Sequence, residues 1–259
     1  MGDKLHRNQL LLLSATGLLM FFSVWSLAAW IELAPRKFLP LPWEVLARGV
    51  ALVSTPFSGQ TLQGHLVVSI DRYLRGFLLA AAIGVPLGLM MGWYRWLDHV
   101  ITPLFDSLRF IAPIAWVPFA ALWFGTGIGG PTMIIFAGAF PPCLINAYRG
   151  ARFVETKYIE AAKVYGASGP RIVYEVLLPA SLPSIIAGLR ISAGAGWQSL
   201  IGAELIAASS GIGLMMVRGQ GALDTSIVMV GMIAVGLFGL LIDVTLRGVE
   251  AWITRKQGH

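Results

Sequence analysis

Six apolar stretches, each long enough to cross a lipid bilayer, constrain this 259-residue chain more than any other feature. A membrane-spanning helix needs roughly 20 mostly apolar residues. Lipid cannot satisfy backbone polar groups, so each stretch must close its own hydrogen bonds as a helix. The sequence predicts an all-α membrane protein whose residues 1–259 form a single transmembrane domain. The expected spans are Gln9–Ile31, Leu66–Trp93, Ile101–Phe124, Pro131–Tyr148, Pro183–Ala207 and Ile227–Val249.

The composition also indicates a membrane protein rather than a soluble one. Charged residues make up 12% of the chain and hydrophobic residues 56%, whereas soluble domains carry about 25% charge. A net charge of +6 would suggest nucleic acid as the partner of a soluble protein. In a membrane protein the same excess is expected on the cytoplasmic side. We therefore expect a lipid bilayer as the surroundings and no nucleic acid partner.

The first stretch has a rival interpretation as a signal peptide, because basic residues precede it and Ser26-Leu27-Ala28 resembles a cleavage site. Its apolar run is longer than the roughly 7–15 residues of a signal peptide core. A retained first span is therefore the favoured prediction.

The distribution of basic residues predicts the orientation of the chain. With the N-terminus in the cytoplasm, the external loops hold only Arg36, Lys37, Arg48 and Arg218 outside the spans. The cytoplasmic segments then hold Lys4, Arg7, Arg95, Arg149, Arg152, Lys157, Lys163, Arg171, Arg247, Arg255 and Lys256. Positive charge accumulates inside. We expect both termini in the cytoplasm and the chain in a bacterial cytoplasmic (inner) membrane.

Small residues recur at every fourth position in two of the spans. Such stripes let helix backbones approach closely where lipid gives no hydrophobic drive for association. They are consistent with packing inside one subunit, with a subunit interface or with the lining of a pathway. The two stripes are Gly84, Gly88 and Gly92, and Gly188, Ser192 and Gly196.

Prolines in the third and fourth spans predict bends, because proline removes a backbone donor and its ring clashes with the preceding turn. These are Pro113, Pro118, Pro141 and Pro142. In the first external loop, Leu39-Pro40-Leu41-Pro42 predicts an extended or turned segment, followed by a short interfacial helix over Trp43–Val53.

The cytoplasmic loop over residues 149–180 is too polar to span and reads as two short helices. Thr156 is a candidate cap of the first, and Gly166 stands where a left-handed C-terminal residue is expected. Ser168 is the expected cap of the second, and Pro179 its expected end. Glu160-Ala161-Ala162 gives the first helix a thin surface that suits a partner groove.

Glu160-Ala161-Ala162, three residues, Gly166, nine residues and then Val176-Leu177-Leu178-Pro179 resemble the EAA loop of binding-protein-dependent ABC transporter permeases. That family's pattern is E-A-A-x3-G-x9-I-x-L-P, and Val176 replaces its isoleucine. Further segments resemble the nitrate/sulfonate/taurine branch of the family. They are Leu39-Pro40-Leu41-Pro42, Ser69 to Arg72, Gly76-Phe77, Leu122-Trp123-Phe124-Gly125, Gly188-Leu189-Arg190, Ala203-Glu204 and Gly211-Ile212-Gly213-Leu214.

The resemblance implies a permease that forms a pathway for a small solute. Its implied partners are a second permease copy, two copies of a cytosolic ABC ATPase and an extracytoplasmic binding protein. The loop would couple to the ATPase through Glu160, Ala161, Ala162, Gly166 and Pro179. ATP and Mg²⁺ would bind to the ATPase, since this sequence has no G-x-x-x-x-G-K-[ST] loop. The glycine stripes favour a homodimer, and no cofactor or metal site is expected in this chain.

Ionisable residues inside a span are functional candidates by default. Arg72 is a candidate for offering a bidentate fork to an anion in the pathway, with Glu204 as a second candidate. For the inner half of the membrane we expect internal ion pairs among Asp106, Arg109, Arg190 and Asp243.

The main rival classes are an intramembrane enzyme and a stand-alone channel or secondary transporter. An enzyme would need a nucleophile with a base, or a metal, and the sequence offers no H-E-x-x-H motif and no complete G-x-S-x-G elbow. We expect no catalytic residue in this chain. The branch resemblance favours a sulfonate, taurine or nitrate-like anion. Aromatic acids, bicarbonate and pyrimidine precursors remain alternatives.

Overall fold

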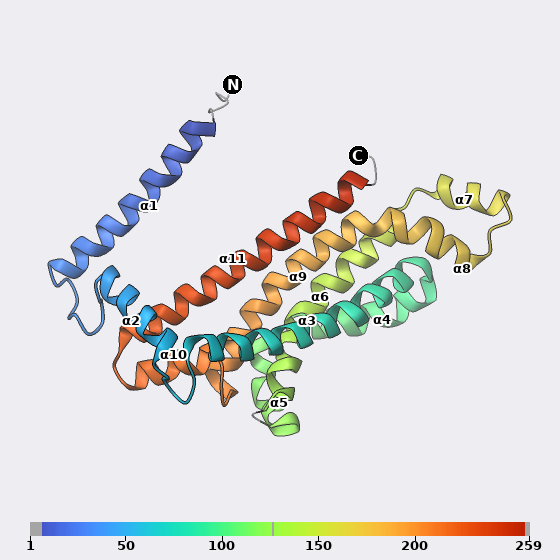
Figure 1. Cartoon of the computed structure of the whole chain (residues 1–259). Helices are drawn as coiled ribbons and strands as arrows, with labels where there is room; N and C mark the ends of the chain where they lie inside the picture. The colour runs from blue at the N-terminus through green and yellow to red at the C-terminus, as the bar shows by residue number, and fades with distance from the viewer. Residues whose placement is uncertain (1–6, 126, 257–259) are drawn as a thin grey trace. The chain divides into compact units, whose positions relative to one another are not determined.

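This computed structural model describes residues 7–125 and 127–256 (Figure 1). Within these residues the regular secondary structure consists of helices joined by loops. The helices in chain order are α1 (Arg7–Trp30), α2 (Pro42–Ser54), α3 (Leu62–Trp93), α4 (Arg95–Leu108), the 3₁₀ helix η1 (Pro113–Trp116), α5 (Val117–Phe124), α6 (Gly129–Arg152), α7 (Thr156–Val164), α8 (Gly169–Ile172), the π-helical turn η2 (Val173–Leu177), α9 (Leu178–Ala207), α10 (Ile212–Gly221) and α11 (Thr225–Lys256).

Five of the described helical segments are long and apolar enough to cross a membrane: α1, α3, α6, α8 to α9, and α11. The number rises to six when α4 and α5 count as one broken span. These lengths confirm the predicted all-α membrane class. The exact limits of each span within the bilayer stay a prediction.

The predicted third span is not one straight helix. Helices α4 and α5 are separated by a short break, and the two halves are bent by 85°. Pro113 opens η1, and Ala112 before it is extended, with φ −56° and ψ 138°. Proline disfavours the helical conformation of the residue before it, so the helix cannot continue here. By contrast, α6 runs unbroken through Pro141 and Pro142.

The chain forms two compact units, which are described separately. The first comprises residues up to Gln63 together with Met215–Ala234. In it, Trp25 Nε1 donates to the Pro40 carbonyl over 3.0 Å. The Glu44 carboxylate accepts the Leu41 backbone N–H at the start of α2. Arg48 forms an ion pair with Asp224 over 3.0 Å. The predicted short helix after the proline segment is confirmed as α2.

The second unit comprises Gly64–Leu214 and Val235–His259, and its core forms where α3 meets α6. A Cβ atom added at Gly84 would lie 2.9 Å from the Cys143 Cβ, and one at Gly76 would lie 2.6 Å from the Ile135 Cβ. Real Cβ contacts essentially never come so close. The first glycine stripe therefore serves packing inside this chain.

The second stripe also packs inside the chain, on the face of α6 that meets α9. A Cβ at Gly196 would lie 3.2 Å from the Ala139 Cβ, and Gly188 lies against the Asn146 side chain. Ser192 is fully buried. Figure 1 shows α6 and α9 side by side along most of their length. Because both stripes are occupied within one chain, they no longer support a homodimer.

We expect Gly88→Ala to destabilise the protein by about 1–3 kcal/mol, the usual effect of overpacking. The added methyl would lie 2.9 Å from both the Ala147 Cβ and the Tyr148 backbone nitrogen, so α6 would have to move. The control is Gly17→Ala in α1, where the new Cβ meets nothing within 4 Å. Thermal unfolding of the purified protein in detergent measures both variants, and equal melting temperatures would contradict the packing assignment.

Candidate functional site

The predicted coupling loop forms a short exposed helix, α7, between α6 and α8 (Figure 1). None of its residues is buried. Glu160 and Ala161 are exposed, and Tyr165, just after the helix, is 91% exposed. The helix therefore presents its surface outward, as a docking element would.

The end of α7 has the left-handed glycine that the sequence predicts. Gly166 has a φ of +75°. Its N–H donates to the Lys163 carbonyl over 2.9 Å, and the Ala167 N–H donates to the Ala162 carbonyl over 3.0 Å. These bonds satisfy carbonyls that the helix end leaves free. The start differs by one residue from the prediction, because Glu155 rather than Thr156 occupies the N-cap position.

Pro179 does not end a helix, contrary to the prediction. The chain stays helical from Gly169 to Ile206, and Pro179 lies in the first turn of α9. The π-helical turn η2 precedes it, in which the Leu178 N–H donates to the Val173 carbonyl five residues back. A wider turn moves the preceding carbonyls away from the proline ring, which removes the clash that would break a regular helix. The loop is thus continuous with α9.

A hollow of about 970 Å³ lies between α7 and the facing ends of α6 and α9. Ala161 and Ala162 line it, together with Pro179 and the charged residues Arg149 and Glu175. Ala161 and Ala162 thus border an open space between α7 and the long helices.

A buried ion pair joins α3 to α9. Arg72 Nη1 lies 3.1 Å from Glu204 Oε1, and the two side chains are 3% and 0% exposed. Arg72 also donates to the Ser210 carbonyl over 2.5 Å and to the Ser210 hydroxyl over 2.8 Å. In this structure the guanidinium is engaged inside the protein, and an anion would have to displace these partners.

The same carboxylate receives further donors. The Ser69 hydroxyl donates to Glu204 over 2.8 Å and accepts the Ile212 N–H over 3.0 Å. The Gly213 N–H donates to Glu204 over 3.0 Å. Gly211 has a φ of +110°, and a Cβ there would run into the Glu204 carboxylate. The cluster therefore ties α3, α9 and the start of α10 together.

The remaining ionisable candidates form two separate groups. Arg109 pairs with Asp106 over 2.7 Å at the end of α4. Arg190 Nε lies 2.8 Å from Asp243 Oδ1, which joins α9 to α11. Glu250 lies 3.3 Å from Arg190 and was not a candidate in the sequence. Its signal was its spacing from Asp243, since residues seven apart share one helix face.

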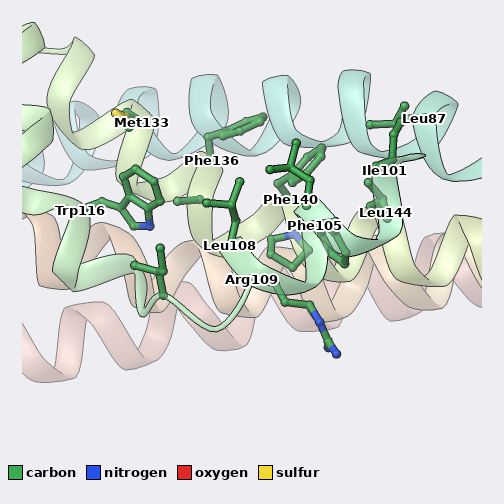
Figure 2. A pocket seen from close by; sticks show the side chains of 14 residues that line it. Leu87, Ile101, Phe105, Leu108, Arg109, Trp116, Met133, Phe136, Phe140 and Leu144 are labelled. Carbon is green, nitrogen blue, oxygen red and sulfur yellow. The ribbon is translucent and has the colours of Figure 1, made fainter. Parts of the chain in front are cut away.

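A second hollow of about 400 Å³ lies among α3, α4, η1 and α6. Its lining is almost entirely apolar, with Phe105, Trp116, Phe136 and Phe140 among the rings (Figure 2). Arg109 also lines the hollow, and its guanidinium carbon lies 6.0 Å from the centre of the Phe105 ring. The hollow is thus an apolar cavity with an arginine in its lining, and that arginine pairs with Asp106.

Comparisons with known proteins match this arrangement. Residues 84–259 match the family described as the binding-protein-dependent transport system inner membrane component. The chain is 41% identical over 214 residues to an ABC transporter permease protein of Methanocaldococcus jannaschii, covering 80% of each chain. It is 31% identical to the taurine transport system permease protein of Escherichia coli, covering 100% of this chain and 98% of the relative.

A third relative has a different named solute, and a solved structure shares the fold. The chain is 33% identical to the bicarbonate transport system permease protein of Synechococcus elongatus, covering 98% of this chain and 94% of the relative. A chain of the inward-facing MetNI methionine ABC transporter matches with a TM-score of 0.54 and 20% identity. That match covers 81% of this chain and 98% of the other.

We expect Arg72→Met to destabilise the protein by about 3–5 kcal/mol, because it leaves the Glu204 carboxylate buried without its cation. The double variant Arg72→Met/Glu204→Gln should recover part of that loss. The matched control is Arg75→Met, one turn along α3, whose pair with Asp71 is exposed; exposed pairs contribute little. Thermal unfolding of all three variants tests this, and a loss for Arg75→Met as large as that for Arg72→Met would refute it.

Proposed function

The chain belongs to the family of binding-protein-dependent transport system inner membrane components, and on that premise we propose how it works within a complete transporter. It is a multi-pass membrane protein and a permease subunit of an ABC importer. We propose that it assembles with a second permease copy, two cytosolic ATPase subunits and an extracytoplasmic binding protein. The permease pair then forms the translocation pathway, and the binding protein delivers the solute.

The exposed helix α7, with its Glu160-Ala161-Ala162 surface and left-handed Gly166, is the observation that carries this proposal. Val164 is 85% exposed and Phe153 is 80% exposed. Contiguous exposed apolar patches mark protein interaction sites, and Val164 is followed directly by Tyr165, which is 91% exposed. We assign α7, with Glu160, Ala161, Ala162 and Gly166, to docking in a groove of the ATPase. Pro179 has a different role, since it lies in the helix that receives the movement.

Movement at α7 reaches the pathway through α8, η2 and α9. These segments form one continuous helical run from Gly169 to Ile206, so a displacement of the loop is applied directly to a membrane-spanning helix. ATP and Mg²⁺ bind to the ATPase subunit in this proposal, and the permease has no catalytic step of its own. The ATPase drives the switch because it binds the two permease conformations with different affinities.

In the proposed orientation, α7 and both termini face the cytoplasm. The basic residues around the loop support it, because positive charge accumulates on the cytoplasmic side. The membrane is the cytoplasmic (inner) membrane.

The proposed solute is a small sulfonate such as taurine. Its support is the similarity over the whole chain to a taurine permease, and over 89% of the chain to a permease for aliphatic sulfonates from Bacillus subtilis. The similarity to a bicarbonate permease makes bicarbonate the solute to compare in any uptake measurement. Uptake of bicarbonate but not of sulfonates would overturn the assignment of the solute.

We expect Glu160→Lys to reduce the stimulation of ATPase activity at least about tenfold, as loss of a central interface residue does. The measurement is ATP hydrolysis by the reconstituted complex with loaded binding protein. The control is Glu32→Lys, the same charge reversal at a 65% exposed acid outside the loop. Full stimulation of the Glu160→Lys complex would remove α7 from the coupling path.

We expect Gly166→Ala to weaken association with the ATPase, because a residue with a Cβ costs about 1–2 kcal/mol in the left-handed conformation. Steric contact is not the cause, since a Cβ at Gly166 meets nothing within 4 Å. Gly169→Ala is the control, because its Cβ is equally free and its φ is not positive. Co-purification of the ATPase with each variant measures the effect, and equal yields would show that the turn is not needed for docking.

A further inference from the structure

Helix α9 has two faces of opposite character. One face packs tightly on α6 and includes the buried residues Ser192 and Leu200. On the other face Ile191, Gly194 and Gln198 are exposed, and a Cβ at Gly194 would meet nothing within 4 Å. Small and polar residues here do not serve packing inside the described chain.

The open face carries a series of alternating charges between α9 and α11. Arg190 lies 2.8 Å from Asp243 and 3.3 Å from Glu250. Asp243 also pairs with Arg247 over 2.7 Å. The formal charges of these four groups sum to zero. Of these three contacts, the one between Glu250 and Arg190 is the longest.

A hollow of about 520 Å³ is lined by Arg190, Asp243 and Glu250 of this series, together with Ala187, Ile191, Gly194, Ala195 and Gln198. That volume lies within the range of small-molecule sites in proteins. The side chains of Arg190, Asp243 and Glu250 are about one third exposed, at 34%, 35% and 33%. They are therefore within reach of a solute in the hollow, unlike the buried pair of Arg72 and Glu204.

Contact with lipid hydrocarbon would be unfavourable for the charged and polar residues on this face of α9. Ionisable residues within a membrane-spanning segment face the interior of the bundle or a water-filled cavity. Arg190 and Asp243 both lie within helices long and apolar enough to span, and Gln198 follows Arg190 two turns along α9. The face of α9 that bears them is thus expected to border water.

We propose that this hollow is a contact site in the translocation pathway for a small zwitterion with a sulfonate at one end and an ammonium group at the other. Arg190 binds the sulfonate through its guanidinium fork, and Glu250 binds the ammonium group. The assignment rests on the proposed function and narrows its solute class. In the absence of solute, Arg190 and Glu250 neutralise one another. On binding, the solute replaces this ion pair with two new contacts, one from its sulfonate to Arg190 and one from its ammonium group to Glu250.

The charge balance favours a zwitterion over a simple anion. The four formal charges of the series sum to zero, because Arg247 pairs with Asp243. A simple anion would therefore leave the site with a net negative charge. A zwitterion adds no net charge, and it provides a charged partner for both Arg190 and Glu250 when it separates them. Charge-assisted hydrogen bonds of this kind are among the strongest available to a small solute.

The first experiment tests whether the face borders water. Cys143 is 1% exposed and is replaced by alanine, and Gln198→Cys is then introduced in the permease–ATPase complex in lipid nanodiscs. We expect the charged reagent sulfonatoethyl methanethiosulfonate to label it at least about tenfold faster than Leu78→Cys, a 59% exposed position on the apolar surface of α3. Equal, slow labelling of both positions would overturn the proposal.

The second experiment tests the solute and the roles of the charges. We expect taurine to protect Gln198→Cys from labelling, and Glu250→Gln to raise the half-protecting taurine concentration about tenfold. Protection by ethanesulfonate, which lacks the ammonium group, should change less than about twofold. Asp71→Asn serves as the control, since it removes an exposed acid that pairs with Arg75 on α3.

The outcomes separate this assignment from the proposed function. Labelling that taurine does not slow, in a complex that still imports sulfonates, would overturn the site and leave the importer assignment intact. Equal loss of protection by both solutes, with a lower melting temperature of Glu250→Gln, would make the charge series a structural brace. A wild-type complex that imports no sulfonate would overturn the proposed solute, and the zwitterion site with it.

Discussion

Close contact between helix backbones at α6 is the constraint on which the second unit depends. Lipid offers no hydrophobic gain when helices associate, so backbone approach must supply the contact energy. Gly84 and Gly88 bring α3 against one side of α6, while Gly188 and Gly196 bring α9 against another. The positions of the polar groups follow, because Arg72 on α3 reaches Glu204 on α9 only when both helices lie close to α6.

The sequence carried the spacing of these contacts but not their partners. A small residue at every fourth position predicts a flat helix face, and it is silent on whether the opposing surface belongs to the same chain. Proline gave similarly partial information. Pro113 located the break in the third span, yet the 85° bend depends on tertiary packing. Pro141 and Pro142 have the same local chemistry and leave α6 unbroken.

The candidate site shows the same division between local and tertiary information. Gly166 was predictable, because a helix that ends in a left-handed residue favours glycine for steric reasons that act within one turn. Pro179 was misread because the π-helical turn before it absorbs the clash that ends an ordinary helix. Ser69, Glu204 and Gly213 belong to three separate segments of the sequence. Only the fold places Ser69 and Gly213 within hydrogen-bond distance of the Glu204 carboxylate. No local sequence pattern predicts this contact.

Two arginine–carboxylate groups on α9 differ in exposure, and exposure decides what each can do. Around Glu204 the donors come from the backbone and from neighbouring helices, and water is excluded. Separating that pair would leave an uncompensated buried charge, so the group holds the helices in a fixed relation. Around Arg190 the partners are one third exposed, and water can replace either contact at small cost. Exchangeable contacts suit a solute that must bind briefly and then leave. The buried group around Glu204 holds the last turns of α9 in place while this exchange occurs.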